Sequence, residues 1–364
     1  MLRKKSAGLC PPGAAETGLV GQGGPMHLLA LVESEKHVCC RYRLSAFREH
    51  LETAGHTLEL RCWPRGWLAP FNPAGPVGHA DAVIVQRRLL APWQIARLRR
   101  KARRLIFDFD DAVFLRDSYS RKGLHDPRRL RRFSAMLRAC DAVTAGNAFL
   151  AEAARSYAAK ARLAVVPTCV DPRRYPLAQH TRAGAGVQLV WIGSASTLQG
   201  LEMIRPLLEL LGREVPGVEL KLICDRFLHL RHLPVVPCPW SEASEASQLA
   251  GADIGLAWIP NDLWSRGKCG LKVLQYLAAG LPVVANPVGV QAEMIRHGEN
   301  GFLAERPEEW VQAIATLSRD PELRRRMGAA GRRRLEAQFS VPVGARRWIE
   351  LLAELQRVRP ARAA

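Results

Sequence analysis

The stretch that decides the fold runs from Arg266 to Gly289 and reads RGKCGLKVLQYLAAGLPVVANPVG. It predicts a glycine-containing loop, a short helix that ends at Gly280, and then a buried strand. Gly267 and Gly270 allow the backbone to approach a ligand closely where the helix begins. The free N–H groups of a helix N-terminus and the helix dipole favour a phosphate at that point.

Polar and cationic side chains surround this predicted helix start. Arg266 precedes the helix, and Lys268 and Lys272 lie four residues apart, so the two lysines can share one face. Gln275 follows three residues after Lys272. Cations, free backbone amides and a polar side chain beside the carboxyl end of a strand indicate a site for a nucleotide diphosphate. The alternative is that these residues are only the solvated start of a helix.

Length and composition set the broad class. The chain has 364 residues, of which 48% are hydrophobic, enough for two domains with sizeable cores. The N-terminal sequence has no apolar segment typical of a secretory signal. The nine cysteines show no paired metal-ligand spacing, and their odd number favours a reducing compartment. A cytoplasmic protein without a metal ion or cofactor is therefore expected.

The charge is large and unevenly distributed. The net charge is +19, and residues 1–170 hold 28 Lys and Arg against 14 Asp and Glu. The excess concentrates in residues 97–104 and 128–132. Such patches attract an anionic membrane surface, which would place the protein at the inner face of a membrane, although a solvated face explains them equally well. Nucleic acid is a weak candidate, because no aromatic-rich motif accompanies the arginines.

Alternating strand and helix patterns predict an α/β protein with parallel sheets covered on both faces. The predicted sections are a flexible tail over 1–25, a first domain over 26–170, a linker over 171–186, a second domain over 187–340 and a C-terminal helical section over 341–364. Single helices are expected over 43–54 and, after a cap at Ser196 or Thr197, as far as 211.

The first stretch also carries a family resemblance. Residues 277–285, LAAGLPVVA, fit the motif E-G-F-G-L-x-x-x-E-A-M-A-A-G-x-P-V-V-A, the donor-binding motif of family 4 glycosyltransferases. Residues 166–176 are similar to that family's interdomain segment. Gly267 and Gln275 replace the two glutamates of the motif. The resemblance implies the GT-B fold, in which two Rossmann-like domains face each other across a cleft, and metal-independent sugar transfer with retention.

The resemblance also implies where the donor binds. Gln275 would contact the donor ribose, as the second glutamate does in the family. The arginine and lysine that usually hold the diphosphate are absent from the loop after residue 192, so we expect nearby cations to replace them. The residues expected at the diphosphate are Gly193, Ser194, Arg266, Lys268, Gly270 and Lys272.

A cluster of carboxylates, FDFDDAVF over residues 107–114, follows another predicted strand. By resemblance, Asp110 and Asp111 would line the interdomain cleft as the catalytic pair. Asp108 could instead be the nucleophile of a magnesium-dependent phosphatase, but Ala112 stands where that motif needs Thr or Val. Chelation of a metal-bound nucleotide, as in the other large glycosyltransferase fold, and helix capping are further alternatives.

The loop over 33–43 joins the first strand to its helix, where acceptor groups commonly bind in the family. Arg41 and Arg43 could hold an acceptor phosphate bidentately, or they could be surface charges. Trp240 could pack beside the donor base, although core packing is the more common role for one tryptophan.

The implied function is transfer of a sugar from a nucleotide-sugar donor to a hydroxyl of a glycan or lipid-linked acceptor, in cell-envelope or exopolysaccharide biosynthesis. Two alternatives remain open at this level. One is a non-catalytic relative that binds a nucleotide sugar, which loss of both motif glutamates would suit. The other is a nucleotide-sugar epimerase with the same fold.

Overall fold

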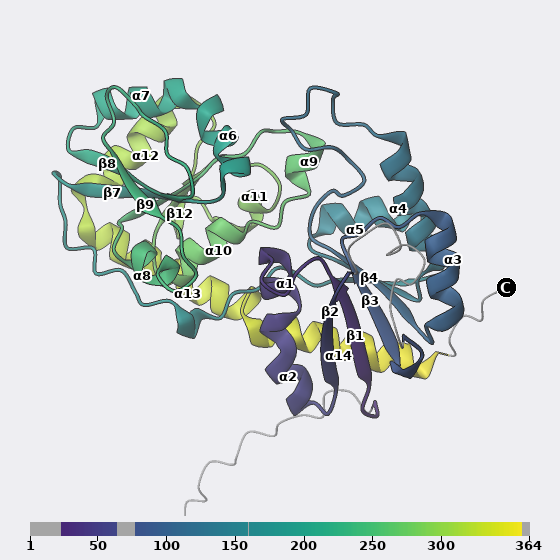
Figure 1. Ribbon diagram of the computed structural model, residues 1–364. Coiled ribbons are helices and arrows are strands. Elements are labelled where there is room, and N and C mark those ends of the chain that lie inside the picture. The colour runs from purple at the N-terminus through teal and green to yellow at the C-terminus, as the bar shows by residue number, and fades with distance from the viewer. Residues whose placement is uncertain (1–22, 64–76, 159, 359–364) are drawn as a thin grey trace, which may run out of the picture.

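Two all-parallel sheets of six strands form the framework of the chain (Figure 1). The computed structural model describes residues 23–63, 77–158 and 160–358. We call the halves built on these sheets the N-terminal and C-terminal lobes. The predicted tail over 1–25 falls almost entirely outside the described residues. The α/β class and the pair of Rossmann-like units are confirmed.

The strands follow the alternation seen in the sequence. The N-terminal sheet has the order β2-β1-β3-β4-β5-β6 and the C-terminal sheet the order β12-β11-β10-β7-β8-β9. The N-terminal strands are β1 (His27–Val32), β2 (Thr57–Cys62), β3 (Ala82–Gln86), β4 (Leu105–Phe109), β5 (Ala142–Ala145) and β6 (Arg162–Val165). The C-terminal strands are β7 (Val187–Ile192), β8 (Val218–Cys224), β9 (Val235–Pro239), β10 (Ile254–Ala257), β11 (Val283–Ala285) and β12 (Gly301–Leu303).

Helices cover both faces of each sheet (Figure 1). In the N-terminal lobe they are α1 (Val38–Arg43), α2 (Arg48–Thr53), α3 (Pro92–Lys101), α4 (Pro127–Ala139) and α5 (Ala148–Arg155). The second half of the chain forms α6 (Ala195–Met203), α7 (Arg205–Glu214), α8 (Glu245–Ala250), α9 (Leu263–Arg266), α10 (Leu271–Ala278), α11 (Val290–Met294), α12 (Pro307–Arg319), α13 (Pro321–Gln338) and α14 (Val341–Arg357). None of the helices in these ranges is long and apolar enough to cross a membrane.

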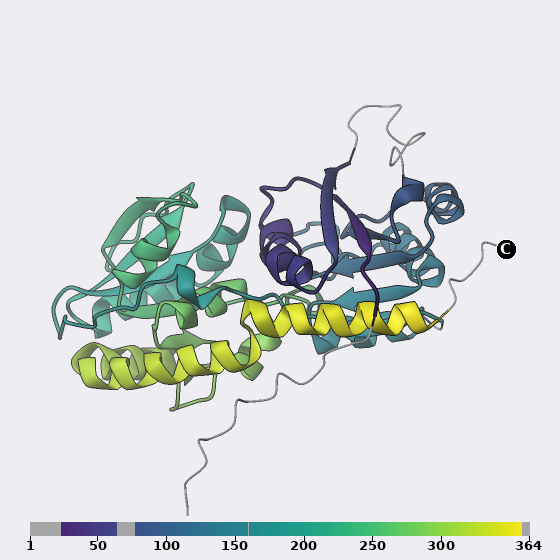
Figure 2. The same cartoon turned by 90° about the horizontal axis from the view of Figure 1, so that it is seen from below.

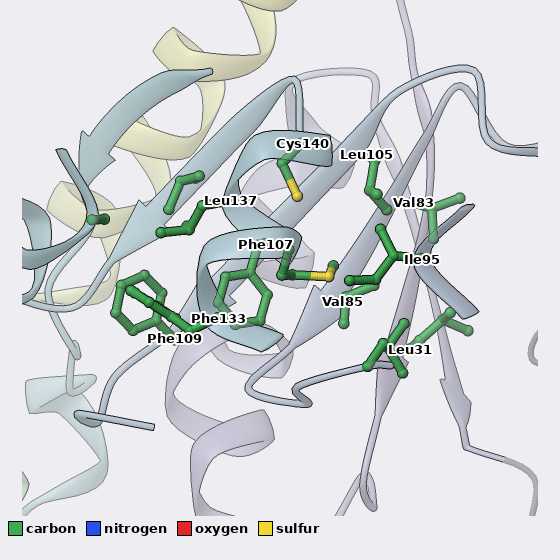
Figure 3. Packing of buried hydrophobic residues seen from close by; sticks show 14 of the residues in the cluster. Leu31, Val83, Val85, Ile95, Leu105, Phe107, Phe109, Phe133, Leu137 and Cys140 are labelled. Carbon is green, nitrogen blue, oxygen red and sulfur yellow. The ribbon is translucent and has the colours of Figure 1, made fainter. Parts of the chain in front are cut away.

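Alternating side chains divide the core of the N-terminal lobe into two layers. Leu29 and Leu31 pack into one buried cluster, whereas Leu28 packs into the cluster on the opposite face of the sheet. Phe107 and Phe109 project to the first face, where their rings stack at 5.3 Å (Figure 3). This period of two requires residue 108, between them, to point to the other face.

The two sheet orders place their switch points near each other. In an open parallel sheet, a ligand binds at the carboxyl edge where the strand order reverses, because the flanking loops diverge there. The reversal lies between β1 and β3 in one sheet and between β7 and β10 in the other. Gly193 and Ser194 follow β7 directly, whereas Asp110 and Asp111 follow β4, the strand next to β3.

The last helix belongs to the core of the first lobe. Figure 2 shows α14 running beneath the N-terminal sheet after α13 leaves the C-terminal lobe. Trp348 and Leu352 of α14 are buried in one cluster with Leu28 of β1 and Phe47. A residue more than 300 positions away in sequence therefore completes the core beneath β1.

Two predicted helices are each divided in the structure. The helix expected over 43–54 consists of α1 and α2, separated by a 3-10 turn over 45–47 and by the non-helical backbone of Leu44. The helix expected as far as 211 begins at Ala195, slightly before the predicted cap, and is divided at Ile204 into α6 and α7. Pro206 explains the second break, because it has no N–H group to continue the hydrogen bonds of α6 and is favoured in the first turn of a new helix.

We expect Trp348→Ala to destabilise the N-terminal lobe selectively by about 3–5 kcal/mol, because it removes a buried ring from the layer between α14 and the sheet. Hydrogen exchange of the β1 and β7 amides would measure the stability of the N-terminal and C-terminal lobes separately. Arg346→Ala, on the exposed side of the same helix, is the matched control and should change neither. Equal loss of protection at β1 and β7 would contradict this assignment.

Candidate functional site

A cavity of about 580 Å³ lies between the two lobes, at the facing carboxyl edges of their sheets. Its size is typical of a site for a small-molecule ligand. Both lobes supply its walls. The predicted site residues that line it are Arg41, Asp110, Asp111, Gly193, Ser194, Lys268, Gly270, Lys272 and Gln275. Arg43 and Arg266 do not.

The loop after β7 and a lysine of α10 form one corner of the cavity. A Cβ atom added to Gly193 would lie 2.6 Å from Nζ of Lys272, so only glycine allows the ammonium group to approach this loop so closely. The same Nζ lies 4.3 Å from the ring centroid of Trp191 and 3.4 Å from Oγ1 of Thr197. Ser194 is the N-cap residue of α6, and the first N–H group of this helix, that of Ala195, donates to Oδ1 of Asp225 at 2.7 Å.

The environment of Lys272 weakens its hold on a proton. Burial lowers its pKa to about 7, and the neighbouring positive charge of Lys268 acts in the same direction. A bound anion would reverse both effects, because it pairs with the ammonium group. This corner therefore has the donors and the charge that a phosphate group requires.

A chain of charged groups links the lobes beside that corner. Nζ of Lys268 lies 3.0 Å from Oδ1 of Asp111 and 3.5 Å from the ring centroid of Trp264. Arg87 pairs with the same carboxylate at 2.7 Å and with Asp110 at 3.4 Å. The two aspartates thus form the negative wall of the cavity opposite the lysines, each balanced by a cation.

The loop before α10 is docked onto the N-terminal lobe. A Cβ atom on Gly267 would lie 2.8 Å from Cβ of Ala112 and 2.9 Å from its backbone nitrogen. Nδ2 of Asn147 donates to the carbonyl oxygens of Gly267 and Lys268, at 3.2 and 3.0 Å. No larger side chain fits at position 267, which explains why the first motif glutamate is missing.

The second motif substitution lies in a buried polar network. Nε2 of Gln275 donates to the hydroxyl oxygens of Tyr42 and Tyr175, both at 3.3 Å. The Tyr42 hydroxyl in turn donates to Oε1 of Glu245 at 2.9 Å. Burial, with the nearby Tyr175 and Glu245, raises the pKa of Tyr42, so its hydroxyl stays protonated. Gln275 thus joins α10 to α1, to the linker and to α8.

Sequence reasoning missed Tyr42 and Glu245, although both line the cavity. Tyr42 lies inside the predicted acceptor loop, but it meets Gln275 across 233 positions of sequence. Glu245 lies in the first turn of α8 and is only 6% exposed. A carboxylate at the start of a short helix is normally explained by its favourable interaction with the helix dipole, so the sequence contained no signal for a role at the site.

The expectation that Arg43 binds an acceptor is not supported by its position. Arg43 is fully buried, and its Nη2 lies 2.6 Å from Oδ1 of Asp108. Arg41 and Arg43 are two residues apart on α1, so they point to nearly opposite sides. Arg41 reaches the cavity and pairs with Glu242 at 2.9 Å, whereas Arg43 points toward the sheet.

Asp108 is likewise removed from the cavity wall. It projects to the side of β4 opposite Phe107 and Phe109 and accepts hydrogen bonds from Arg43 and from Oγ1 of Thr144, the latter at 2.7 Å. It is fully buried, which argues against the phosphatase interpretation. Among the described residues, no group of three or more His, Cys, Asp and Glu side chains could hold a metal ion.

Arg266 also differs from its predicted position. Its guanidinium group is exposed and donates through Nη2 to Oδ1 of Asn261 at 3.1 Å, outside the cavity wall. Arg266 ends α9 on the solvent side, because the chain turns at Gly267 to reach α10. Of the three cations expected to compensate at the diphosphate, the structure therefore brings only Lys268 and Lys272 to the cavity.

Comparisons with known proteins agree with this architecture. Residues 263–334 match the family model described as glycosyl transferases group 1. Over 86 residues, 24% of the chain, it is 31% identical to a trehalose synthase of Pyrococcus horikoshii. That match covers 21% of the relative, so the chain spans about a fifth of its length.

Solved structures are similar over nearly the whole chain. A sucrose-phosphate synthase of Thermosynechococcus elongatus superposes with a TM-score of 0.68 and 15% identity, covering 89% of this chain and 96% of that one. HepE of Anabaena, in complex with UDP and glucose, gives a TM-score of 0.67 and 16% identity, covering 90% and 100%. At these identities the likeness establishes the fold. Residues 263–334 therefore match the glycosyl transferases group 1 model, and the two-lobe architecture of the chain is the GT-B fold.

Proposed function

We propose that this protein transfers a sugar from a nucleotide-sugar donor to a hydroxyl acceptor in the cavity between its lobes. The observation that carries the proposal is the corner where Gly193 admits Nζ of Lys272 beside the N-terminus of α6. An anionic diphosphate fits a cation that lies beside the positive end of a helix dipole. HepE, a structural neighbour, was solved in complex with UDP and with UDP-glucose, which supports a nucleotide sugar as the donor.

In this proposal the two lysines stabilise the departing nucleoside diphosphate. Negative charge develops on the diphosphate as its bond to the sugar breaks, and cations fixed in a partly buried site stabilise that charge more strongly than water does. Lys272 is in place without a ligand, whereas Lys268 would exchange Asp111 for a phosphate oxygen. Two cations at this site make a metal ion unnecessary for charge balance.

We further propose that the reaction retains the configuration of the sugar. The acceptor hydroxyl would attack the sugar carbon on the face that the diphosphate leaves. A new carbon–oxygen bond forms, the bond to the diphosphate oxygen breaks, and the hydroxyl proton passes to that phosphate. Asp110 and Asp111 would orient the hydroxyls of the donor sugar and acceptor from the opposite wall. Arg41 is the remaining candidate for the acceptor side.

The acceptor would be a glycan or a lipid-linked sugar of a cell-envelope or exopolysaccharide pathway. The charge of the N-terminal lobe motivates this choice. Helices α3 and α4 lie side by side (Figure 1) and both carry exposed cations, and Leu130 of α4 is 40% exposed. A basic face with apolar side chains is suited to an anionic membrane surface. The exposed cations of these two helices include Arg100, Lys101, Arg128 and Arg131.

Product analysis separates this proposal from its alternatives. Incubation with UDP-, GDP-, ADP- and dTDP-sugars, with and without cell-envelope lipid extract, should release a nucleoside diphosphate and yield a glycosylated product in the presence of acceptor. Conversion of the sugar nucleotide without an acceptor would identify an epimerase. Saturable binding without turnover across the panel would identify a non-catalytic relative.

Lys272→Met should weaken UDP binding about 10- to 100-fold, because it removes a charge-assisted contact to phosphate while keeping similar apolar length. Isothermal titration calorimetry of wild type and variant measures the change. Lys160→Met, an exposed lysine outside the cavity wall, is the matched control and should bind like wild type. Unchanged affinity of the Lys272 variant would contradict the assigned diphosphate site.

The pKa of Lys272 near 7 predicts pH-dependent binding. As pH rises from 7 to 9, free Lys272 loses its proton, so an anionic ligand must recover that proton on binding and its affinity falls. The terminal phosphate of UDP is already ionised over this range. Lys272→Arg should bind with a flat profile, because guanidinium stays protonated. An equally flat profile for wild type would show that Lys272 is charged throughout.

The proposed membrane contact predicts salt-sensitive binding to anionic vesicles. At low salt, wild type should sediment with vesicles that contain about 30 mol% phosphatidylserine. It should sediment less with neutral phosphatidylcholine vesicles. Replacing Arg100, Lys101, Arg128 and Arg131 by Gln should weaken binding by about 100-fold or more, at about 1 kcal/mol per charge. The matched control replaces four exposed arginines of the C-terminal lobe, Arg213, Arg319, Arg326 and Arg333, by Gln. Equal loss in both variants would indicate a nonspecific charge effect.

A further inference from the structure

Four tryptophans line the cavity, and they differ in what their rings can still contact. Trp191 is 2% exposed, and the ammonium group of Lys272 lies over its ring. The ammonium group of Lys268 lies over the ring of Trp264, and Trp258 packs against the core of the C-terminal lobe. Trp240 is 41% exposed, which makes it the exposed tryptophan of this wall within the described residues.

Trp240 is held in place by hydrogen bonds at both ends. Its backbone N–H donates to the carbonyl oxygen of Cys224 at 3.2 Å, across the carboxyl ends of β8 and β9. Its indole Nε1 donates to Oε2 of Glu245 at 2.9 Å. The edge of the ring is therefore fixed, whereas much of its surface stays exposed at the cavity. This arrangement argues against the core-packing role considered for it from the sequence.

Glu245 is itself fixed by groups of the other lobe. Its Oε1 accepts hydrogen bonds from the Tyr42 hydroxyl at 2.9 Å and from Nη2 of Arg41 at 3.3 Å, both on α1. The carboxylate is almost fully buried, so it cannot move without breaking these contacts. The orientation of the Trp240 ring thus depends on contacts from the N-terminal lobe.

We infer that Trp240 is the surface on which the planar base of the donor nucleotide stacks, and that Glu245 is the positioning residue that fixes its ring. The inference rests on the proposed function, because it assigns the base to the same cavity as the diphosphate. A rigid aromatic surface binds a heterocyclic base at little entropic cost, since its side chain is ordered before binding. Stacking of this kind tolerates different bases, because every base has a π-face.

The test compares a nucleotide with a probe that lacks a base. UDP, GDP, ADP, dTDP and inorganic pyrophosphate are titrated into wild type, and the tightest nucleotide is carried forward. Trp240→Ala should weaken the binding of that nucleotide about 5- to 150-fold and leave the affinity for pyrophosphate unchanged. Trp240→Phe, which keeps an aromatic surface, should retain most of the affinity. Phe227→Ala is the matched control, an exposed aromatic side chain of the same lobe outside the cavity wall.

The outcomes separate this inference from the proposed function. Failure of wild type to bind either a nucleotide or pyrophosphate would overturn both. Nucleotide binding that is lost in Lys272→Met but equal in wild type and Trp240→Ala would keep the donor site and overturn the stacking role. Equal weakening of nucleotide and pyrophosphate by Trp240→Ala would also overturn it, because a general distortion of the cavity would then be responsible.

The role of Glu245 requires its own readout. Glu245→Ala should weaken nucleotide binding, and Glu245→Gln should restore most of it, because the amide oxygen can still accept the indole N–H. The double variant Trp240→Ala, Glu245→Ala should bind no more weakly than Trp240→Ala alone, since the carboxylate acts through the ring. Additive losses would overturn the positioning role.

Discussion

The arrangement of the cavity depends on the close contact between Gly267 and Ala112. Two segments from different lobes come close there because position 267 has no side chain, and Asn147 secures the contact with two hydrogen bonds. This contact brings the loop before α10 within reach of the carboxylates after β4. Without it, Lys268 would have no partner in the other lobe, and the lysines and aspartates would not form opposite walls of one site.

Contacts between the lobes give a physical reason for both departures from the family motif. A glutamate at position 267 would need space that Ala112 and its backbone occupy. A glutamate at position 275 would place a second carboxylate beside Tyr42, whose hydroxyl already donates to Glu245. Like charges in a buried network are costly, whereas the amide of Gln275 supplies donors to both tyrosines. The two substitutions therefore fit this network of neighbours.

Patterns local in sequence, together with the family resemblance, were sufficient to predict the fold and nine of the residues that line the cavity. The apolar runs of β1 and β4 and the glycines around α10 act through backbone preference and burial, which short windows of sequence contain. The sequence could not predict that Arg43 and Arg266 lie outside the cavity wall, because charge alone does not say on which side of a helix a residue lies. Glu245 and Tyr42 could not be found at all, since their meeting depends on how two lobes pack.

The path of α14 has a consequence for how the protein acquires its structure during synthesis. Domains usually fold in order as the chain emerges from the ribosome. Here Trp348 and Leu352 complete the hydrophobic layer beneath β1, so the N-terminal lobe must wait with an apolar surface uncovered while the whole C-terminal lobe is made. The first half to be synthesised is therefore the last to be finished, and its exposed sheet face is where a chaperone would be needed.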